Sequence, residues 1–335
     1  MKINFRIALL LSAALLLISV PSRASSPCCE SAGSDHAEAG NTAIGDRFLM
    51  GLSYSYSLME GYREGAESLS IGDIREKTDY TVIPVDMEME RYTLSAGYKP
   101  NPRTPVSVAV PYVRYTMAMS LDRGPGLGWE ETEMDPVSGL GDIVLRSGYV
   151  ISPPSETDNG SLTVGAGVKT PSGDYRKKGS SGNFIHAHMQ PGSGSWDPLA
   201  FIAYGREGEK VSFDLSASYQ YATRNPEGYR FGSVASLKAT GRYYPLRRLG
   251  ISGGLEFLDV GKASDRDGKY TNPASLIDDT ANTGGDALWG SAGLELSPPG
   301  SANVSLKFQF PLWERVNGIQ LVTKYGLVAS FSASF

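Results

Sequence analysis

Residues 48–58 read Phe-Leu-Met-Gly-Leu-Ser-Tyr-Ser-Tyr-Ser-Leu, and the alternation within this stretch decides the fold. One set of alternate positions holds large apolar or aromatic side chains, namely Phe48, Met50, Leu52, Tyr54, Tyr56 and Leu58. The positions between them are mostly glycine and serine. Successive side chains of a β-strand point to opposite faces, so the stretch predicts a strand with one apolar face and one polar face.

The same period of two recurs along the whole chain. It is clear in residues 211–221, where apolar and aromatic residues alternate with polar ones such as Asp214 and Gln220. Ten further segments show it, at 87–99, 104–119, 139–151, 160–170, 197–205, 228–244, 248–259, 286–297, 302–312 and 318–335. An even number of such strands is typical of bacterial single-chain membrane barrels. The pattern therefore predicts an all-β fold, a single up-and-down antiparallel transmembrane β-barrel of about twelve strands.

The lengths of the connections support this fold independently of the strands. Short links, rich in Pro, Gly and charge, fall at 100–103, 152–159, 206–209, 245–247 and 298–301. They alternate with long links near 59–86, 120–138, 171–196 and 260–285, although two links on the long side, 223–227 and 313–317, are short. Short periplasmic turns and longer outer loops alternate in outer-membrane barrels. The order predicts that both termini face the periplasm.

The N-terminus carries an export signal. Lys2 and Arg6 precede an apolar run over residues 7–20, and Ser22-Arg23-Ala24 places small residues where a signal peptidase cleaves. The run is too short to span a bilayer as a helix. We therefore expect a signal peptide at 1–24, a polar periplasmic segment at 25–46 and the barrel at 47–335. The predicted location is the outer membrane.

Composition and charge exclude some functions. The mean hydropathy of −0.21 looks soluble, but a barrel with one polar and one apolar face has such an average. The net charge is −5, and no basic patch with interleaved aromatic residues suggests a nucleic-acid partner. The two cysteines, Cys28 and Cys29, are adjacent, so they cannot join distant parts of the fold. The expected partners are outer-membrane lipid, the outer-membrane assembly machinery and a small solute.

The two ends of the predicted strands carry further signals for a membrane. Tyrosine and tryptophan gather near strand ends, which is typical of the aromatic girdles at the two headgroup levels. The chain also ends on Phe335 after a series of alternating apolar residues. A terminal strand of this kind is similar to the insertion signal of outer-membrane barrels.

Several motifs resemble a known family. They are Gly139-Leu140-Gly141-Asp142, Val168-Lys169-Thr170-Pro171-Ser172-Gly173, Gln190-Pro191-Gly192-Ser193-Gly194-Ser195-Trp196-Asp197, Val85-Asp86-Met87-Glu88-Met89 and Ala109-Val110-Pro111-Tyr112. From about Gly45 to the C-terminus the chain resembles the outer-membrane transporter family labelled "MetA-pathway of phenol degradation". The usual Pro-Thr-Gly of the family is Pro171-Ser172-Gly173 here. The resemblance implies a barrel with a transport role, and it implies no substrate.

Candidate chemistry is sparse. Of the three histidines, His36 lies in the N-terminal segment, while His186 and His188 lie in the third long loop. Outer-membrane phospholipases pair a His with a Ser two residues later, and neither loop histidine has one. A nucleophile needs a positioned base, so we expect no enzyme and no cofactor.

Binding of a soft metal ion is a more specific alternative to catalysis. Thioether, thiolate and imidazole groups suit Cu(I), and this chain offers Met87, Met89, Met117, Met119, His186, His188, Cys28 and Cys29. The simpler interpretation is that the methionines pack against lipid or loops and that the histidines are solvated. No Cys-x-x-Cys motif or helical His spacing favours the metal.

Charged residues on the polar strand faces are the candidate transport residues. They are Arg146, Lys169, Asp214, Arg230, Lys238, Arg242, Glu256, Glu295, Lys307 and Lys324. A charge facing hydrocarbon costs roughly 2–4 kcal/mol at the midplane, so these side chains should point inward. They could line a narrow aqueous path or lock into an ion-pair plug. The main hypothesis is a passive channel for a small solute. The alternative is a closed interaction barrel that binds a metal or a partner protein through its loops or its Cys28-Cys29 tail, and an enzyme is the third.

Overall fold

The computed structural model describes residues 47–155, 159–179, 182–298 and 301–335. The predicted signal peptide at 1–24, the predicted polar segment at 25–46, and Cys28 and Cys29 lie outside the described residues. Within the described part of the chain, no helix is both long and apolar enough to cross a membrane.

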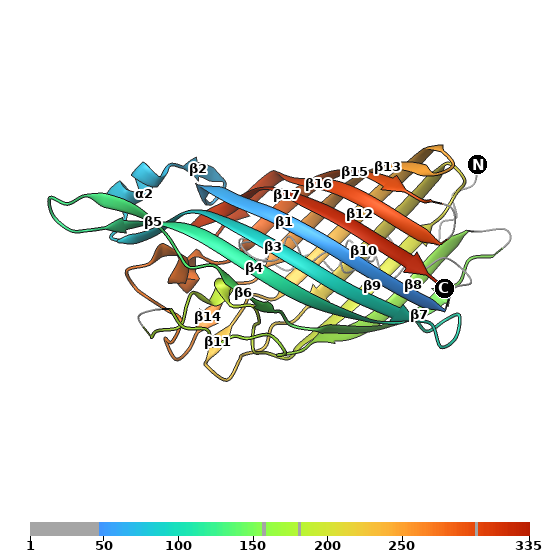
Figure 1. The fold of residues 1–335 in the computed structure, drawn as a ribbon, viewed down its shortest axis with the longest axis horizontal. Coiled ribbons are helices and arrows are strands. Elements are labelled where there is room, and N and C mark those ends of the chain that lie inside the picture. The colour runs from blue at the N-terminus through green and yellow to red at the C-terminus, as the bar shows by residue number, and fades with distance from the viewer. Residues whose placement is uncertain (1–46, 156–158, 180–181, 299–300) are drawn as a thin grey trace, which may run out of the picture.

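Twelve long strands form one closed antiparallel barrel (Figure 1). In chain order they are β1 (Phe48–Glu64), β3 (Val82–Tyr98), β4 (Val106–Asp122), β7 (Val144–Ser152), β8 (Gly160–Lys169), β9 (Asp197–Arg206), β10 (Val211–Gln220), β12 (Val234–Leu246), β13 (Leu249–Val260), β15 (Gly285–Leu296), β16 (Ala302–Val316) and β17 (Ile319–Ser334). Each pairs with the barrel strands before and after it in the chain, and β17 pairs with β1. The predicted fold class and strand number are confirmed.

The first and last strands close the ring. Leu49 lies opposite Ser334, and the pairing continues along the strands to Glu64 opposite Ile319. The final residue takes part, because the Phe335 backbone N–H donates to the Phe48 carbonyl at 2.9 Å. Closure leaves no unpaired edge, which is the condition for a sheet to stand in hydrocarbon.

The outer face of the barrel carries the apolar side chains that the alternation predicted. Phe48, Met50 and Leu52 are about half exposed, whereas Ser55 and Ser57 of the same strand are buried. The other exposed large apolar side chains of the wall include Leu94, Leu145, Tyr149, Ile202, Phe213, Leu237, Ile251, Leu255, Leu294, Leu306, Phe308, Leu327 and Phe331. A face of this kind is energetically suited to lipid.

A row of tyrosines marks the border of this apolar face on the side of the loops. Tyr54, Tyr92 and Tyr112 lie side by side on β1, β3 and β4, and the rings of Tyr54 and Tyr92 are 4.9 Å apart. Two residues further toward the loops, on the same outward face, Arg114 Nη1 lies 2.8 Å from Glu90 Oε2. Tyrosine at the headgroup level with ionised groups beyond it is typical of a membrane interface. Three aromatic residues that the sequence places at the outer strand ends, Tyr115, Tyr229 and Trp289, are buried instead of facing outward.

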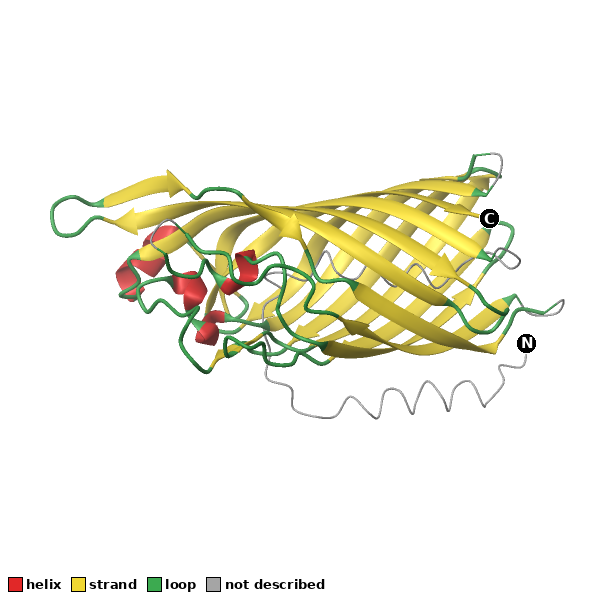
Figure 2. Ribbon diagram, turned by 60° about the horizontal axis from the view of Figure 1, so that its bottom comes forward, coloured by secondary structure: helices red, strands yellow, loops and turns green. Residues whose placement is uncertain are grey.

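The remaining elements gather at one end of the barrel (Figures 1 and 2). They are β2 (Glu67–Leu69), α2 (Ile71–Lys77), β5 (Trp129–Glu133), β6 (Val137–Leu140), η2 (Ala187–Met189), β11 (Tyr229–Arg230), β14 (Ser264–Asp265), η3 (Leu276–Asp278) and η4 (Thr280–Asn282). The opposite end carries the short connections and the C-terminus. Arg47 also lies there, because its N–H donates to the Phe335 carbonyl. That this end faces the periplasm stays a prediction.

Two predicted strands are interrupted. The segment predicted at 139–151 consists of β6, which ends at Leu140, and β7, which begins at Val144. The segment predicted at 228–244 consists of β11, which pairs with β14 among the loops, and the barrel strand β12. At the first break the outward-facing positions change from even numbers, as at Leu140, to odd numbers, as at Leu145. At the second break the alternation continues, so it could not reveal that break.

Candidate functional site

The described part of the barrel encloses two adjoining cavities. The outer cavity, of about 190 Å³, lies toward the loops and is lined by residues that include Arg91, Lys169 and His188. The inner cavity, of about 170 Å³, lies toward the end with the short connections and is lined by serine and threonine side chains together with apolar residues of β1, β3, β4, β16 and β17. Val144 and Arg146 of β7 line both cavities. Arg146 therefore stands where they meet.

A cluster of polar groups joins loops to the wall beside the outer cavity. We call Asp142, Lys169, Ser193 and Asp197 the motif junction. Lys169 Nζ lies 2.7 Å from Asp197 Oδ2 and 3.7 Å from Asp142 Oδ2. Asp142 Oδ1 accepts from the Gly173 N–H, and Asp142 Oδ2 accepts from the Ser193 N–H and hydroxyl. Asp197 is fully buried, and its Oδ1 accepts from the Thr223 N–H. The junction thus ties residues from three separate stretches to one charge cluster.

The motif glycines allow two backbones to touch at this junction. A Cβ atom on Gly192 would lie 2.5 Å from the Gly173 Cα and 2.6 Å from Asp142 Oδ1. A Cβ atom on Gly173 would lie 2.6 Å from the Gly192 Cα. Gly194 adds a positive φ of 70°, a conformation that favours glycine. These glycines are therefore needed for close approach of the chain, in addition to turn formation.

The segments that meet here are three of the motifs that carried the sequence resemblance. The family described as "Putative MetA-pathway of phenol degradation" matches residues 86–315, which is more than half of the chain. The chain belongs to this family. No sequence among the curated proteins matches it. For this member of the phenol-degradation family, the motifs mark the point where loops are fastened to the barrel.

Solved structures are similar to this chain. An outer membrane channel from Pseudomonas putida F1 is 15% identical in sequence, with a TM-score of 0.57 over 88% of this chain and 97% of that chain. A FadL homologue from Pseudomonas aeruginosa is 12% identical, with a TM-score of 0.43 over 89% of this chain and 93% of that chain. The first likeness establishes that this family member has the fold of an outer-membrane barrel.

The charges on one side of the lumen are paired. Arg242 of β12 lies between two carboxylates, because its Nε is 2.9 Å from Glu295 Oε1 and its Nη1 contacts Asp214. Lys238 of β12 and Glu256 of β13 are opposite each other in the sheet, and both are buried. The Ser236 hydroxyl also donates to Glu256 Oε1. These five predicted residues form two groups along β10, β12, β13 and β15, and each group contains both a base and an acid.

On the other side, the predicted residues Arg146 and Lys307 line the inner cavity. Arg91 lines the outer cavity and was not predicted. Arg91 lies on the same face of β3 as the buried Met87 and Met89, so alternation could have found it. Lys169, as predicted, faces the lumen. It lies at the end of β8 nearest the loops, where it lines the outer cavity and pairs with Asp142 and Asp197.

Two predicted lumen residues lie elsewhere. Lys324 is 54% exposed and pairs with Glu60, which is 51% exposed, at 2.9 Å. A β-bulge between Leu58 and Met59 shifts the register, so that Tyr325 is opposite Leu58 while Thr323 is opposite Met59. Lys324 is the extra residue at this bulge, so its side chain no longer belongs to the series that points into the lumen. Arg230 lies in β11, which pairs with β14 in a separate two-stranded sheet among the loops.

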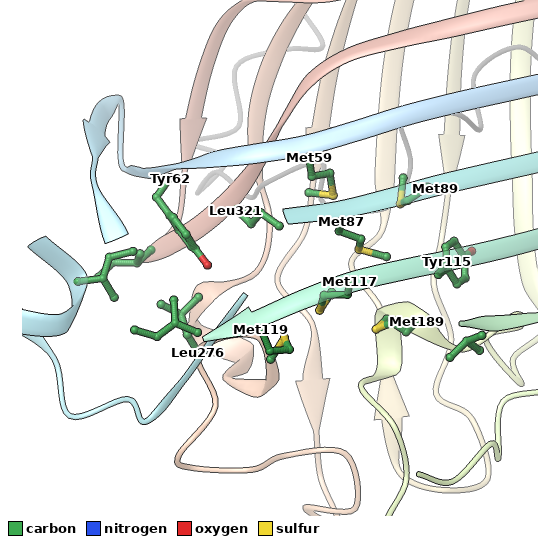
Figure 3. Packing of buried hydrophobic residues seen from close by; sticks show 14 of the residues in the cluster. Met59, Tyr62, Met87, Met89, Tyr115, Met117, Met119, Met189, Leu276 and Leu321 are labelled. Atoms are coloured by element: carbon green, nitrogen blue, oxygen red, sulfur yellow. The ribbon is translucent and has the colours of Figure 1, made fainter. Parts of the chain in front are cut away.

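The predicted methionines belong to a packed apolar cluster at the loop end of the lumen. Met59, Met87 and Met117 are opposite one another on β1, β3 and β4, and we call them the methionine row. Met89, Met119 and Met189 pack in the same cluster (Figure 3). Ile74 of α2 and Leu276 of η3 complete it, so that loops cover the row. Their packing is that of a hydrophobic core, and a soft-metal site at these residues stays a prediction.

The two loop histidines and Asp278 form a chain of hydrogen bonds. His186 Nδ1 lies 2.7 Å from Asp278 Oδ1, and His186 Nε2 lies 3.0 Å from His188 Nδ1. In neutral imidazoles this order lets His188 donate to His186 and His186 donate to Asp278. His188 also packs edge-on against the ring of Phe231. Among the described residues, no group of three or more His, Cys, Asp or Glu is placed to hold a metal ion.

His188 makes the loop assembly sensitive to acid. Burial, aided by the nearby His186, holds the pKa of His188 well below its usual value of 6.5. A base with a depressed pKa in the folded state binds protons better when unfolded, so its contribution to stability is full above about pH 6.5 and falls as the pH drops below that value. We expect the thermal unfolding temperature to fall between about pH 7.5 and about pH 5. The fall should be smaller in His188→Gln, and an equal fall would contradict this role.

Proposed function

We propose that this protein is a passive channel of the outer membrane, with both termini in the periplasm, through which a small solute crosses down its concentration gradient. One observation carries the proposal. Two adjoining cavities, joined at Arg146, lie inside a closed barrel whose outer face is apolar. The family assignment and the barrel fold agree with it.

The lumen has the chemistry of a polar path. Charged groups such as Arg146, Lys238 and Lys307 lie inside a wall that faces lipid, and ionised groups at membrane depth are retained where they meet water, ions or opposite charge. Insertion would use β17 and the residue that follows it, Phe335, which is 66% exposed. The proposal needs no catalytic residue and no cofactor, because a gradient drives the passage.

A closed interaction barrel is the second candidate. It is favoured by the apolar cluster around the methionine row, because loops pack onto this cluster at the outer end of the lumen. In such a barrel the cavities would end blindly, and the loops would be the functional surface. The two candidates differ in whether ions pass.

Single-channel recording in planar bilayers separates the candidates. The mature chain is refolded in detergent, and folding is verified by the heat-dependent shift of its gel mobility. We expect discrete, steady current steps, and heat-denatured protein serves as the control. A folded barrel that stays silent at all applied voltages would reject the channel and favour the closed barrel.

A further inference from the structure

A finger of sheet projects past the row of tyrosines on the side of the loops (Figure 1). We use this name for β5 together with residues 82–86 of β3 and 118–122 of β4. β5 pairs with this part of β4, which follows Tyr112 along the strand. The finger therefore stands beyond the apolar face that suits lipid.

The two edges of the finger differ in what covers them. At the β3 edge, the N–H groups of Thr81 and Val82 donate to the Ala274 carbonyl, and Val82 also pairs with Ser275. At the β5 edge, the described residues show no strand or loop that pairs with the side facing away from β4. The finger thus has one covered edge and one open edge.

The pairing between β4 and β5 shows which backbone groups are already used. The Arg123 N–H donates to the Gly128 carbonyl, and the Met134 N–H donates to the Met117 carbonyl. In an antiparallel pair, every second residue exchanges hydrogen bonds with the same neighbour. The even-numbered residues of β5 therefore bond to β4.

The odd-numbered residues of β5 make up the open edge. The backbone N–H and C=O groups of Trp129, Glu131 and Glu133 point away from β4, and no hydrogen bond within the described part of the chain reaches them. Residues 130–133 are all exposed to solvent. An edge of this kind is a template on which another extended chain can pair.

The helix α2 holds this edge in place. The Arg75 guanidinium carbon lies 4.6 Å from the centroid of the Trp129 ring, and Arg75 Nη2 donates to Ser120 Oγ at 2.6 Å. One side chain thereby contacts both β4 and β5. A strand that is ordered in advance loses less conformational entropy when a partner binds to it.

The open edge is acidic. Residues 122–135 contain one base and five acids, namely Arg123 and Asp122, Glu130, Glu131, Glu133 and Asp135. Arg123 Nε lies 2.6 Å from Glu130 Oε2, so the hairpin has an excess of four negative charges, five minus one. Glu131 and Glu133 lie on one face of β5, because alternate residues of a strand point to the same side.

Charge decides which occupant fits this edge. Two copies of β5 paired with each other would bring carboxylates opposite carboxylates, which is unfavourable, and charged side chains also discourage neutral chains from pairing with an edge. A strand with lysine or arginine at alternate positions places bases opposite Glu131 and Glu133 instead. Opposite charges across a strand pair are favourable.

We propose that the open edge of β5 is a docking site for an extended basic segment of another protein, which adds to the finger as a further strand. The backbone of the partner bonds to Trp129, Glu131 and Glu133, and its alternate basic side chains face the two glutamates. The site lies outside the lumen, so the inference goes beyond the proposed channel and holds for a conducting barrel and for a silent one.

The first test varies the partner. A dye-labelled peptide in which lysine alternates with threonine is titrated with the folded, full mature barrel in detergent. We expect a saturable rise in fluorescence anisotropy that weakens with added salt. The same peptide with N-methylated backbone amides keeps every charge and loses its donors, so it should bind roughly tenfold or more weakly. The proposal fails if the lysine peptide does not bind, or if the methylated peptide or one with glutamate in place of lysine binds equally well.

The second test varies the charge of the edge. The double variant Glu131→Gln, Glu133→Gln should bind the lysine peptide roughly fivefold more weakly, because two exposed ion pairs are lost. The matched control is Glu67→Gln, Glu76→Gln, which removes two exposed carboxylates from β2 and α2 and should leave the affinity unchanged. Equal weakening in both double variants would mean general attraction by the acidic chain and would overturn the site.

The third test varies the backbone of the edge. Glu131→Pro removes an N–H group that points away from β4, a position at which strands tolerate proline, and it should abolish peptide binding while the heat-dependent gel shift persists. In wild type, bound peptide should slow amide hydrogen exchange within residues 122–135. Unchanged exchange there would overturn the proposal. So would a wild-type dimer that Glu131→Pro converts to a monomer, because the occupant would then be a second copy.

Discussion

Asp142→Ala is expected to release the loop at 171–196 from the barrel. The change leaves the Gly173 and Ser193 N–H groups without their acceptor and takes one of two carboxylates from Lys169, whose side chain is 16% exposed. Loss of a buried charged acceptor of this kind costs roughly 3 kcal/mol. The population of the open loop should then rise about a hundredfold. Trypsin cleavage at Arg176 and Lys177, measured under native conditions in detergent, follows this population.

The matched control for this prediction lies in the same loop. Asp174 is 54% exposed, and its side chain contacts only its own neighbours in the loop: it accepts from the Arg176 N–H at 3.0 Å and has a loose ion pair with Lys177 at 3.8 Å. Asp174→Ala breaks no contact with the barrel, so it should change the cleavage rate little. Asp142→Asn keeps the shape of the side chain and should give an intermediate rate. If Asp142→Ala were cleaved no faster than Asp174→Ala, the motif junction would not be the fastening of this loop.

Replacing the methionine row with alanine is expected to raise the single-channel conductance. Met59, Met87 and Met117 are each at most 3% exposed, and loops pack against them. Truncating three adjacent side chains leaves space that water can enter, and an apolar constriction that becomes wet conducts better. We expect the conductance of the triple variant to be roughly twofold or more above wild type. The folded state should also lose about 2 kcal/mol or more for each truncation.

Two controls separate the effect of space from that of chemistry. Replacing the same three residues with leucine keeps the volume nearly constant, so conductance and stability should stay close to wild type. Met50→Ala removes a methionine that is 52% exposed on the lipid face, and it should leave the current unchanged. The leucine variant also tests the soft metal, because leucine has no thioether. Cu(I) binding that survives in it would exclude the row as a ligand set.

The strands could be predicted because alternation is written directly in the sequence. Phe48 to Leu58 show it on β1, and the same period located the barrel strands, with bounds that differ by up to six residues from those observed. Breaks depend on distant contacts instead. At the interruption, residues 141–143, the backbone of Gly141 forms hydrogen bonds with Pro111 and Ser172, and the Asp142 side chain accepts one from Gly173. These partners are distant from the interruption in the sequence. Neither periodicity nor composition contains that information.

The lumen residues were harder to predict than the wall. Arg146 and Lys307 follow from alternation alone, because the inward series is unbroken at their positions. Lys324 does not, since one bulge changes the side to which it points. The pairing of Arg242 with Asp214 and Glu295 depends on the register of three different strands, which sequence patterns leave open. The grouping of Arg242 with two carboxylates therefore became visible only in three dimensions.

The seam between β1 and β17 has a consequence for biogenesis. The ring is completed by its two ends, with Phe335 hydrogen-bonded to Phe48. Until β17 has paired with β1, the sheet has two edge strands with unpaired N–H and C=O groups. Such edges readily pair with other chains. We therefore expect the unclosed chain to aggregate in water more readily than the closed barrel.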